Sequence, residues 1–365
     1  MNLKGQALLD AIRYLPTIRS RQAELKGYAE LRAETKAALH PLVSLGKLGR
    51  IDQSDRILGV VVEKVGTCFL DLNTTAYQTC GDWEVLCNPD DAYGAWRTFA
   101  RQHGEVTPVA LLRDGGHDRP FIRQVLKIEA EWGVVVIRSR RPSTDLPALQ
   151  AALAAVDDVN NVLIVLDYGY VRQALEPKEV DARRVISALR LTDPAARVVV
   201  MGSSFPKSVA AYGENAGTLE ILERDLHAQI GGDEVAIYGD HASIYPEPFE
   251  PAISRYVPRV DYCTDNTWLY RRRREDDGGY VDAATRVTQS EDWEPAFAAR
   301  SWGANIIRLT VDNGPQPGFG SPANWIAARV NMHIERQTEV SLRAYGGGEG
   351  GEGSGGFEDD FQDLV

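Results

Sequence analysis

Cysteine and methionine are scarce in this chain of 365 residues, which contains four cysteines and three methionines. The cysteines are Cys68, Cys80, Cys87 and Cys263, and none of them belongs to a Cys-x-x-Cys pair or has a histidine at zinc spacing. We therefore expect neither a zinc site nor a disulfide framework. Free thiols are typical of a reducing compartment, so we expect a cytoplasmic protein.

Long apolar runs and a net positive charge are lacking as well. No apolar run is long enough to span a bilayer, and the N-terminus shows no secretory apolar segment, so we expect no membrane partner. The formal net charge is -12, and six of the acidic residues lie between Gly346 and Val365. This balance argues against duplex DNA as a partner.

Short apolar segments, each followed by a helical pattern, recur along residues 1–244. Strands are predicted at 14–18, 40–45, 67–72, 107–112, 134–137, 162–166, 197–202 and 234–238. Helices are predicted between them at 22–39, 53–64, 89–103, 120–132, 147–156, 179–191 and 218–230. This alternation predicts an α/β fold, a (β/α)8 TIM-like barrel. An open doubly wound sheet is the alternative, although no Gly-x-Gly-x-x-Gly follows a strand.

The remaining chain has a different pattern. Strands are predicted at 262–273 and 306–311, and a helix at 324–338. We expect residues 245–345 to form a C-terminal elaboration that packs at the barrel mouth and supplies the last helix. Residues 346–365 are rich in glycine and glutamate and are predicted to be a disordered acidic tail.

Polar residues follow the predicted strands, and barrels of this class build their sites where strands end. We expect Asp71, Arg113, Arg138, Asp167 and Asp240 to lie at one end of the barrel. Guanidinium groups bind phosphate or carboxylate in a bidentate manner. The candidate ligand-binding residues are Arg19, Arg21, Arg113, Arg138, Ser203, Ser204 and His241. Asp167 and Asp240 are the candidate catalytic residues, as general base or as Mg²⁺ ligands.

Three interpretations of these strand ends stay open. The arginines and aspartates could neutralise one another in a polar rim, or they could form an anion site. A metal site made of Asp71, Asp167, Asp240 and His241 is the third, but no closely spaced ligand motif supports it and no metal is assigned. The sequence indicates no cofactor.

Several short motifs, in this order, resemble the beta family proteins, a group named for a T4-type phage beta protein. They are YLPTIRSRQAEL at 14–25, HPLV at 40–43, SSFP at 203–206, GDHAS at 239–243, GSPANW at 320–325 and NMH at 331–333. By motif match, the resemblance implies that Arg19, Arg21, Glu24, Asp240 and His333 are site residues. His241 stands where the family usually has tyrosine.

The resemblance also implies a biological setting. Such proteins occur in phages, prophages and mobile or defence-like bacterial loci, and their activity is not established. One hypothesis is a non-catalytic protein that binds a phosphate-bearing anionic ligand or a protein partner at the barrel mouth. The alternative is a TIM-barrel hydrolase or phosphodiesterase-like enzyme that acts on a phosphate-containing substrate.

Two further segments have more than one interpretation. Phe357–Val365 is acidic with interleaved hydrophobic residues, which resembles the tails by which single-stranded-DNA-binding proteins recruit partners. The alternative is an autoinhibitory or merely solubilising tail. Arg271 to Arg274 form a run of four arginines that either holds a nucleic acid backbone or is a solvated strand edge followed by acids.

Overall fold

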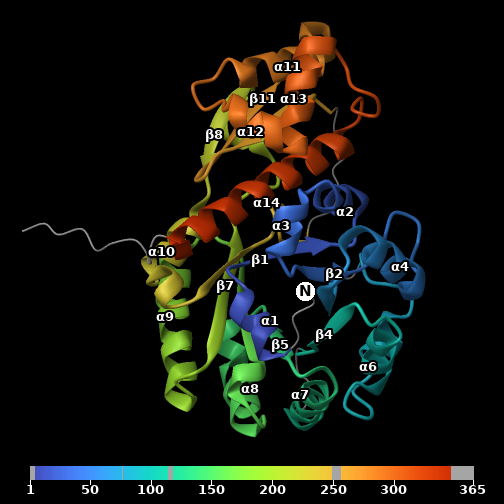
Figure 1. The fold of residues 1–365 in the computed structure, drawn as a ribbon, viewed down its shortest axis with the longest axis vertical. Coiled ribbons are helices and arrows are strands. Elements are labelled where there is room, and N and C mark those ends of the chain that lie inside the picture. The colour runs from blue at the N-terminus through green and yellow to red at the C-terminus, as the bar shows by residue number, and fades with distance from the viewer. Residues whose placement is uncertain (1–4, 76, 114–117, 249–255, 347–365) are drawn as a thin grey trace, which may run out of the picture.

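The computed structural model describes residues 5–75, 77–113, 118–248 and 256–346, which form a barrel and a smaller lobe (Figure 1). Eight parallel strands close the barrel in the order β1-β2-β3-β4-β5-β6-β7-β9. The predicted (β/α)8 barrel is thereby confirmed, and the open sheet is excluded. The tail segment Phe357–Val365 lies outside the described residues.

The barrel strands follow the predicted segments closely. They are β1 Tyr14–Arg19, β2 Leu42–Leu45, β3 Cys68–Leu72, β4 Val106–Ala110, β5 Val135–Ser139, β6 Val162–Tyr170, β7 Arg197–Ser203 and β9 Ile237–Asp240. The helices of this part are α1 Gln6–Ala11, α2 Gln22–Ala29, α3 Ala33–Ala37, α4 Ser54–Val65, α5 Trp83–Leu86, α6 Gly94–Arg101, α7 Asp118–Trp132, α8 Pro142–Ala155, α9 Leu175–Thr192 and α10 Leu222–Gln229. Short 3-10 turns are η1 Val159–Asn161, η2 Val209–Tyr212 and η3 Gly232–Glu234.

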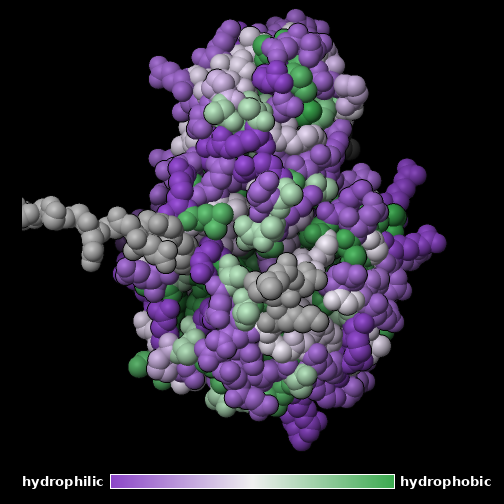
Figure 2. All heavy atoms as spheres, in the orientation of Figure 1, coloured by the Kyte–Doolittle hydropathy of each residue, from purple (hydrophilic) through white to green (hydrophobic). Residues whose placement is uncertain are grey.

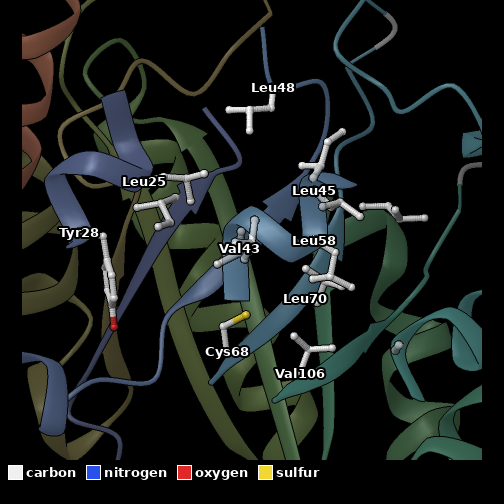
Figure 3. Packing of buried hydrophobic residues seen from close by; sticks show 14 of the residues in the cluster. Leu25, Tyr28, Val43, Leu45, Leu48, Leu58, Cys68, Leu70 and Val106 are labelled. Carbon is white, nitrogen blue, oxygen red and sulfur yellow. The ribbon is translucent and has the colours of Figure 1, made fainter. Parts of the chain in front are cut away.

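Both faces of the barrel strands are buried, which explains their unbroken apolar runs. One set of alternate residues fills the interior, including Leu15, Phe69 and Val165, with Leu9 of α1 in the same cluster. The other set packs under the surrounding helices. Figure 3 shows part of this outer layer, where Leu25 of α2 lies near Val43 of β2.

A three-stranded antiparallel sheet forms the base of the smaller lobe. Its order is β10 (Arg259–Cys263), β11 (Thr267–Arg272) and β8 (Ala216–Glu220), so the chain after β7 contributes one edge strand. The lobe also contains η4 Glu275–Asp277, α11 Gly279–Thr288, α12 Pro295–Arg300 and α13 Trp302–Asn313. In the view of Figure 2, the surface is mostly hydrophilic with small, separate hydrophobic patches.

Three predictions about this lobe were wrong. The single strand expected at 262–273 is a hairpin that turns after Cys263. Residues 218–220 pair with β11 instead of starting a helix, because a distant strand offers them hydrogen bonds. The strand expected at 306–311 lies inside α13, where Ser301 accepts a hydrogen bond from the Ala304 amide and so caps the helix.

Helix α14 (Pro322–Gly346) runs between the barrel and the lobe (Figure 1). It packs on α2 and β1 of the barrel and on α13 and β10 of the lobe, in the place of the eighth barrel helix. Glycines permit these close approaches. A Cβ atom on Gly27 of α2 would lie 2.6 Å from the Ala327 carbonyl oxygen, and one on Gly303 of α13 would lie 2.2 Å from that of Ala328.

This packing predicts opposite effects for two glycine substitutions. Gly27→Ala should lower the free energy of unfolding by about 1–3 kcal/mol, because its methyl group overlaps α14. Gly59→Ala in α4 is the matched control, since no atom lies within 4 Å of the new Cβ atom. It should raise stability by about 0.5–1 kcal/mol through helix propensity. Urea denaturation measures both, and a Gly27→Ala protein as stable as wild type would contradict the packing.

Candidate functional site

A polar layer occupies the inside of the barrel at the C-terminal ends of the strands. The inward positions are apolar deeper in the barrel, as at Val136 and Val165. Two residues further along the same strands they become Arg138 and Asp167, because side chains alternate between the faces of a strand. This layer consists of Thr17, Ser44, Asp71, Arg138, Asp167 and His241.

Arg138 is at the centre of this layer and is 6% exposed. Its Nη2 and Nε atoms donate to Asp167 Oδ2 at 2.7 and 3.0 Å, and Nη1 donates to Asp71 Oδ2 at 3.0 Å and to Ser44 Oγ at 2.9 Å. One buried cation thus joins four strands. A buried charge is tolerated only when it is paired in this way.

Asp167 accepts hydrogen bonds at both of its carboxylate oxygen atoms. Besides Arg138, the Gly169 amide donates to Oδ1 at 2.9 Å, and His241 Nε2 lies 2.9 Å from the same atom. Burial opposes ionisation, but His241 and Arg138 outweigh it and hold the pKa of Asp167 well below its ordinary value. The carboxylate is therefore a weak proton acceptor that orients its neighbours.

A cavity of about 220 Å³ lies beside this layer at the barrel mouth. Its charged lining includes Arg19, which pairs with Glu24 at 2.9 Å, and Arg140, whose Nη2 donates to Asp71 Oδ2 at 2.6 Å. Uncharged donors and acceptors complete the wall, namely Asn73, Thr74, Thr75 and Gln78. The cavity can accept a small polar ligand that carries charge at one end.

Asp240 and His333 lie elsewhere, on the outer face of the barrel under α14. Asp240 is fully buried and accepts from Tyr14 Oη at 2.7 Å, Tyr238 Oη at 3.0 Å and the Ala242 amide at 2.8 Å. His333 Nε2 lies 2.8 Å from the Asp240 carboxylate.

The protonation of His333 follows from its other neighbour. The Trp268 indole nitrogen donates to His333 Nδ1 at 3.2 Å, and an indole nitrogen can only donate. His333 Nε2 therefore carries the proton that it donates to Asp240. Burial opposes ionisation of Asp240, but His333 and the other donors lower the pKa of this carboxyl below its ordinary value. Asp240 thus joins β9, β1 and α14, which is a structural role.

Ser203, Ser204 and Arg113 also take part in hydrogen bonds within the protein. The Phe205 amide donates to Ser203 Oγ at 3.3 Å, and the Ser204 amide donates to Glu223 at 2.9 Å. Arg113 donates to the Cys87 carbonyl at 3.1 Å and lies over the Trp83 ring. Of the predicted residues, the cavity wall contains Arg19, Glu24, Arg138, Asp167 and His241; it does not include Arg21, Arg113, Ser203, Ser204, Asp240 or His333.

The sequence interpretation missed several residues of the site. Ser44 follows Leu42 by two positions, so strand periodicity could have placed it inside. Arg140 follows Arg138 by two positions at the end of the same strand, so strand periodicity could have placed it on the same side. Glu247 accepts from the Tyr170 amide at 3.1 Å across a long sequence distance, and no local pattern indicates this contact.

Within the described part of the chain, no group of three or more histidine, cysteine, aspartate or glutamate side chains could hold a metal ion. None of the described helices is both long and apolar enough to cross a membrane. The four cysteines are free and buried.

Known proteins are similar in sequence to this chain over most of its length. The model of the family described as Beta protein matches residues 14–339. The chain belongs to the Beta protein family. Protein beta of Enterobacteria phage P4 is 32% identical over 364 residues, covering 96% of this chain and 98% of the relative. The resemblance found in the sequence is therefore confirmed, although this relative comes from phage P4 and not from a T4-type phage.

One solved structure is weakly similar to this chain. The biosynthetic arginine decarboxylase SpeA from Campylobacter jejuni matches with a TM-score of 0.33 and 10% identity, covering 90% of this chain and 55% of that one. A similarity this low supports no shared activity.

Replacing Arg138 should lower the stability of the folded protein. Arg138→Met removes the cation shared by two buried carboxylates and leaves Asp71 with Arg140 and Asp167 with His241, so the free energy of unfolding should fall by about 3–5 kcal/mol. Arg308→Met in α13 is the control, because that exposed pair with Asp312 contributes about 0–1 kcal/mol. Adding Asp71→Asn and Asp167→Asn to Arg138→Met should recover much of the loss. A single variant as stable as the control would contradict the role of Arg138.

The lowered pKa of Asp167 predicts a pH dependence of stability. A depressed folded-state pKa contributes stability above the unfolded value, 3.8, and that contribution is lost as pH falls through the folded value. Wild type should therefore lose stability below about pH 4 more steeply than Asp167→Asn. Denaturation series at several pH values measure the two slopes, and equal slopes would show that Asp167 titrates normally.

Proposed function

We propose that the mouth cavity binds a small phosphate-bearing anion without needing a metal. In this proposal the Beta family protein acts in the cytoplasm of a cell that carries a phage or mobile element, in phage defence. The observation that carries the proposal is the environment of Arg140. Its side chain is 34% exposed and makes one hydrogen bond, to Asp71, among the described residues. Most of its N–H donors are therefore open to the cavity.

The charges around Arg140 favour an incoming anion. Asp71 is shared between Arg138 and Arg140, so two guanidinium groups compete for one carboxylate. Burial and the adjacent Arg138 lower the pKa of Arg140 from its ordinary value. An anion beside Arg140 would relieve this repulsion, and a guanidinium group binds phosphate oxygens in a bidentate manner. Arg19 offers a second cation on the wall.

A second candidate function is phosphodiester hydrolysis. The supporting observation is the contact between His241 and Asp167, since a carboxylate that orients an imidazole is a common arrangement for a general base. In this version His241, and not Asp167, would take the proton from an attacking water, because Asp167 is held ionised by its donors. A protein partner at the mouth is less favoured than a small ligand, because it would need a contact surface larger than this cavity.

Calorimetric titration with inorganic phosphate tests the anion site. Arg140→Gln should weaken phosphate binding by about tenfold, since a hydrogen bond to a charged group contributes about 1.5–3 kcal/mol. Arg113→Gln is the matched control, because Arg113 does not line the cavity, and it should bind as wild type does. Equal affinities of wild type and Arg140→Gln, or no binding by wild type, would contradict the proposal.

Incubation with a chromogenic phosphodiester separates the two functions. Turnover that disappears in His241→Asn, with phosphate binding retained, would establish the enzyme. Phosphate binding without turnover would establish the binding protein.

A further inference from the structure

A second cavity, of about 180 Å³, lies in the smaller lobe, away from the barrel mouth. It is bounded by the chain after β7, by β10 and β11, and by the start of α14. Its lining includes the cations Lys207, Arg259 and Arg272 and the aromatic residues Tyr256 and Trp325. We call this the lobe cleft.

Two guanidinium groups, those of Arg259 and Arg272, line the lobe cleft. Asp261 is the one acidic residue among the described residues that line it, and this carboxylate is already paired. Arg329 Nη1 donates to Asp261 Oδ2 at 2.8 Å, and Arg259 Nε donates to the same atom at 3.1 Å. The guanidinium of Arg329 lies 3.9 Å from the centre of the Phe205 ring and is buried. Among the described residues, Arg272 therefore has no carboxylate partner within the cleft.

Arg272 has the properties of a phosphate ligand. Its Nη1 atom donates to the Glu214 carbonyl at 2.6 Å, and no carboxylate among the described residues forms an ion pair with it. The mouth cavity differs, because Arg19, Arg138 and Arg140 each contact a carboxylate there. An anion therefore meets less competition in the lobe cleft.

An aromatic ring lies beside these cations. Tyr256 is 47% exposed, and its hydroxyl accepts a hydrogen bond from Tyr280 at 2.8 Å. Tyr280 in turn stacks on Trp325, with ring centroids 4.9 Å apart and planes at 14°. Tyr256 is thus linked through its hydroxyl to a stacked aromatic pair, and its ring is partly exposed. Such a ring offers a surface on which a base can stack.

The run of arginines continues this surface beyond the cleft. Arg273 pairs with Asp282 at 2.5 Å, but Arg274 is 73% exposed and lies 3.8 Å from the exposed carboxylate of Glu214. This exposed pair is weak in water. Arg272 and Arg274 are two residues apart, so an extended phosphate backbone could contact both.

We propose that the lobe cleft and the adjoining arginines bind single-stranded nucleic acid, with phosphates at Arg272 and Arg274 and one base on Tyr256. Cationic grooves with exposed aromatic rings are the usual means of holding a single strand. The net charge of -12 does not oppose a local site of this kind, whereas it disfavours the broad electrostatic contact that a duplex requires. The proposal does not depend on the anion site at the mouth.

Fluorescence anisotropy with a short labelled oligothymidylate tests the site in the full chain. Tyr256→Leu should weaken binding by about 5- to 100-fold, because stacking on one base contributes about 1–3 kcal/mol. Tyr256→Phe keeps the ring and should bind as wild type does. Arg272→Gln should reduce the slope of log affinity against log salt by about 0.7, as expected for the loss of one phosphate contact.

Two control variants locate the binding. Arg308→Gln, exposed on α13, and Arg140→Gln, at the mouth, should both bind the oligonucleotide as wild type does. The proposal is overturned if wild type does not bind, if Tyr256→Leu and Arg272→Gln both bind normally, or if Arg140→Gln alone abolishes binding. Competition by thymidine monophosphate at the same concentration as the oligonucleotide would also overturn it, in favour of a free nucleotide.

Discussion

A buried guanidinium between two carboxylates fixes the chemistry of this barrel. The free energy of removing Arg138 from water is offset only because β3 and β6 hold Asp71 and Asp167 at hydrogen-bond distance. That requirement ties β2, β3, β5 and β6 together at their C-terminal ends. It also determines what remains for a ligand, since Arg138 makes four hydrogen bonds with its five N–H donors whereas Arg140 makes one among the described residues.

The architecture could be predicted because eight buried strands need the same local pattern, an apolar run followed by an amphipathic helix. The lobe could not be predicted equally well. Leu219 lies in a segment that pairs with β11, which is distant in sequence, and local propensity contains no information about that partner. Ile306 and Ile307 favour a strand by type, but the Ser301 cap and the buried face of α13 make that segment a helix.

The position of polar residues along the barrel axis could also be predicted, but not the side of the strand on which they lie. Asp167 and Asp240 both end a strand. Asp167 follows the inward residue Val165 by two positions, whereas Asp240 follows the outward residue Tyr238. When both faces of a strand are apolar, the sequence does not reveal which face is inside. Asp240 therefore lies on the outer face of the barrel, where it contacts α14.

The crystal structure of the protein with bound inorganic phosphate tests the central claim most directly. A phosphate beside Arg140 in the mouth cavity is predicted, with Arg138 still between Asp71 and Asp167. The Arg140 side chain should exchange part of its contact with Asp71 for the phosphate oxygens. A phosphate found only outside the mouth, or Arg138 turned away from the two carboxylates to bind it, would contradict the account.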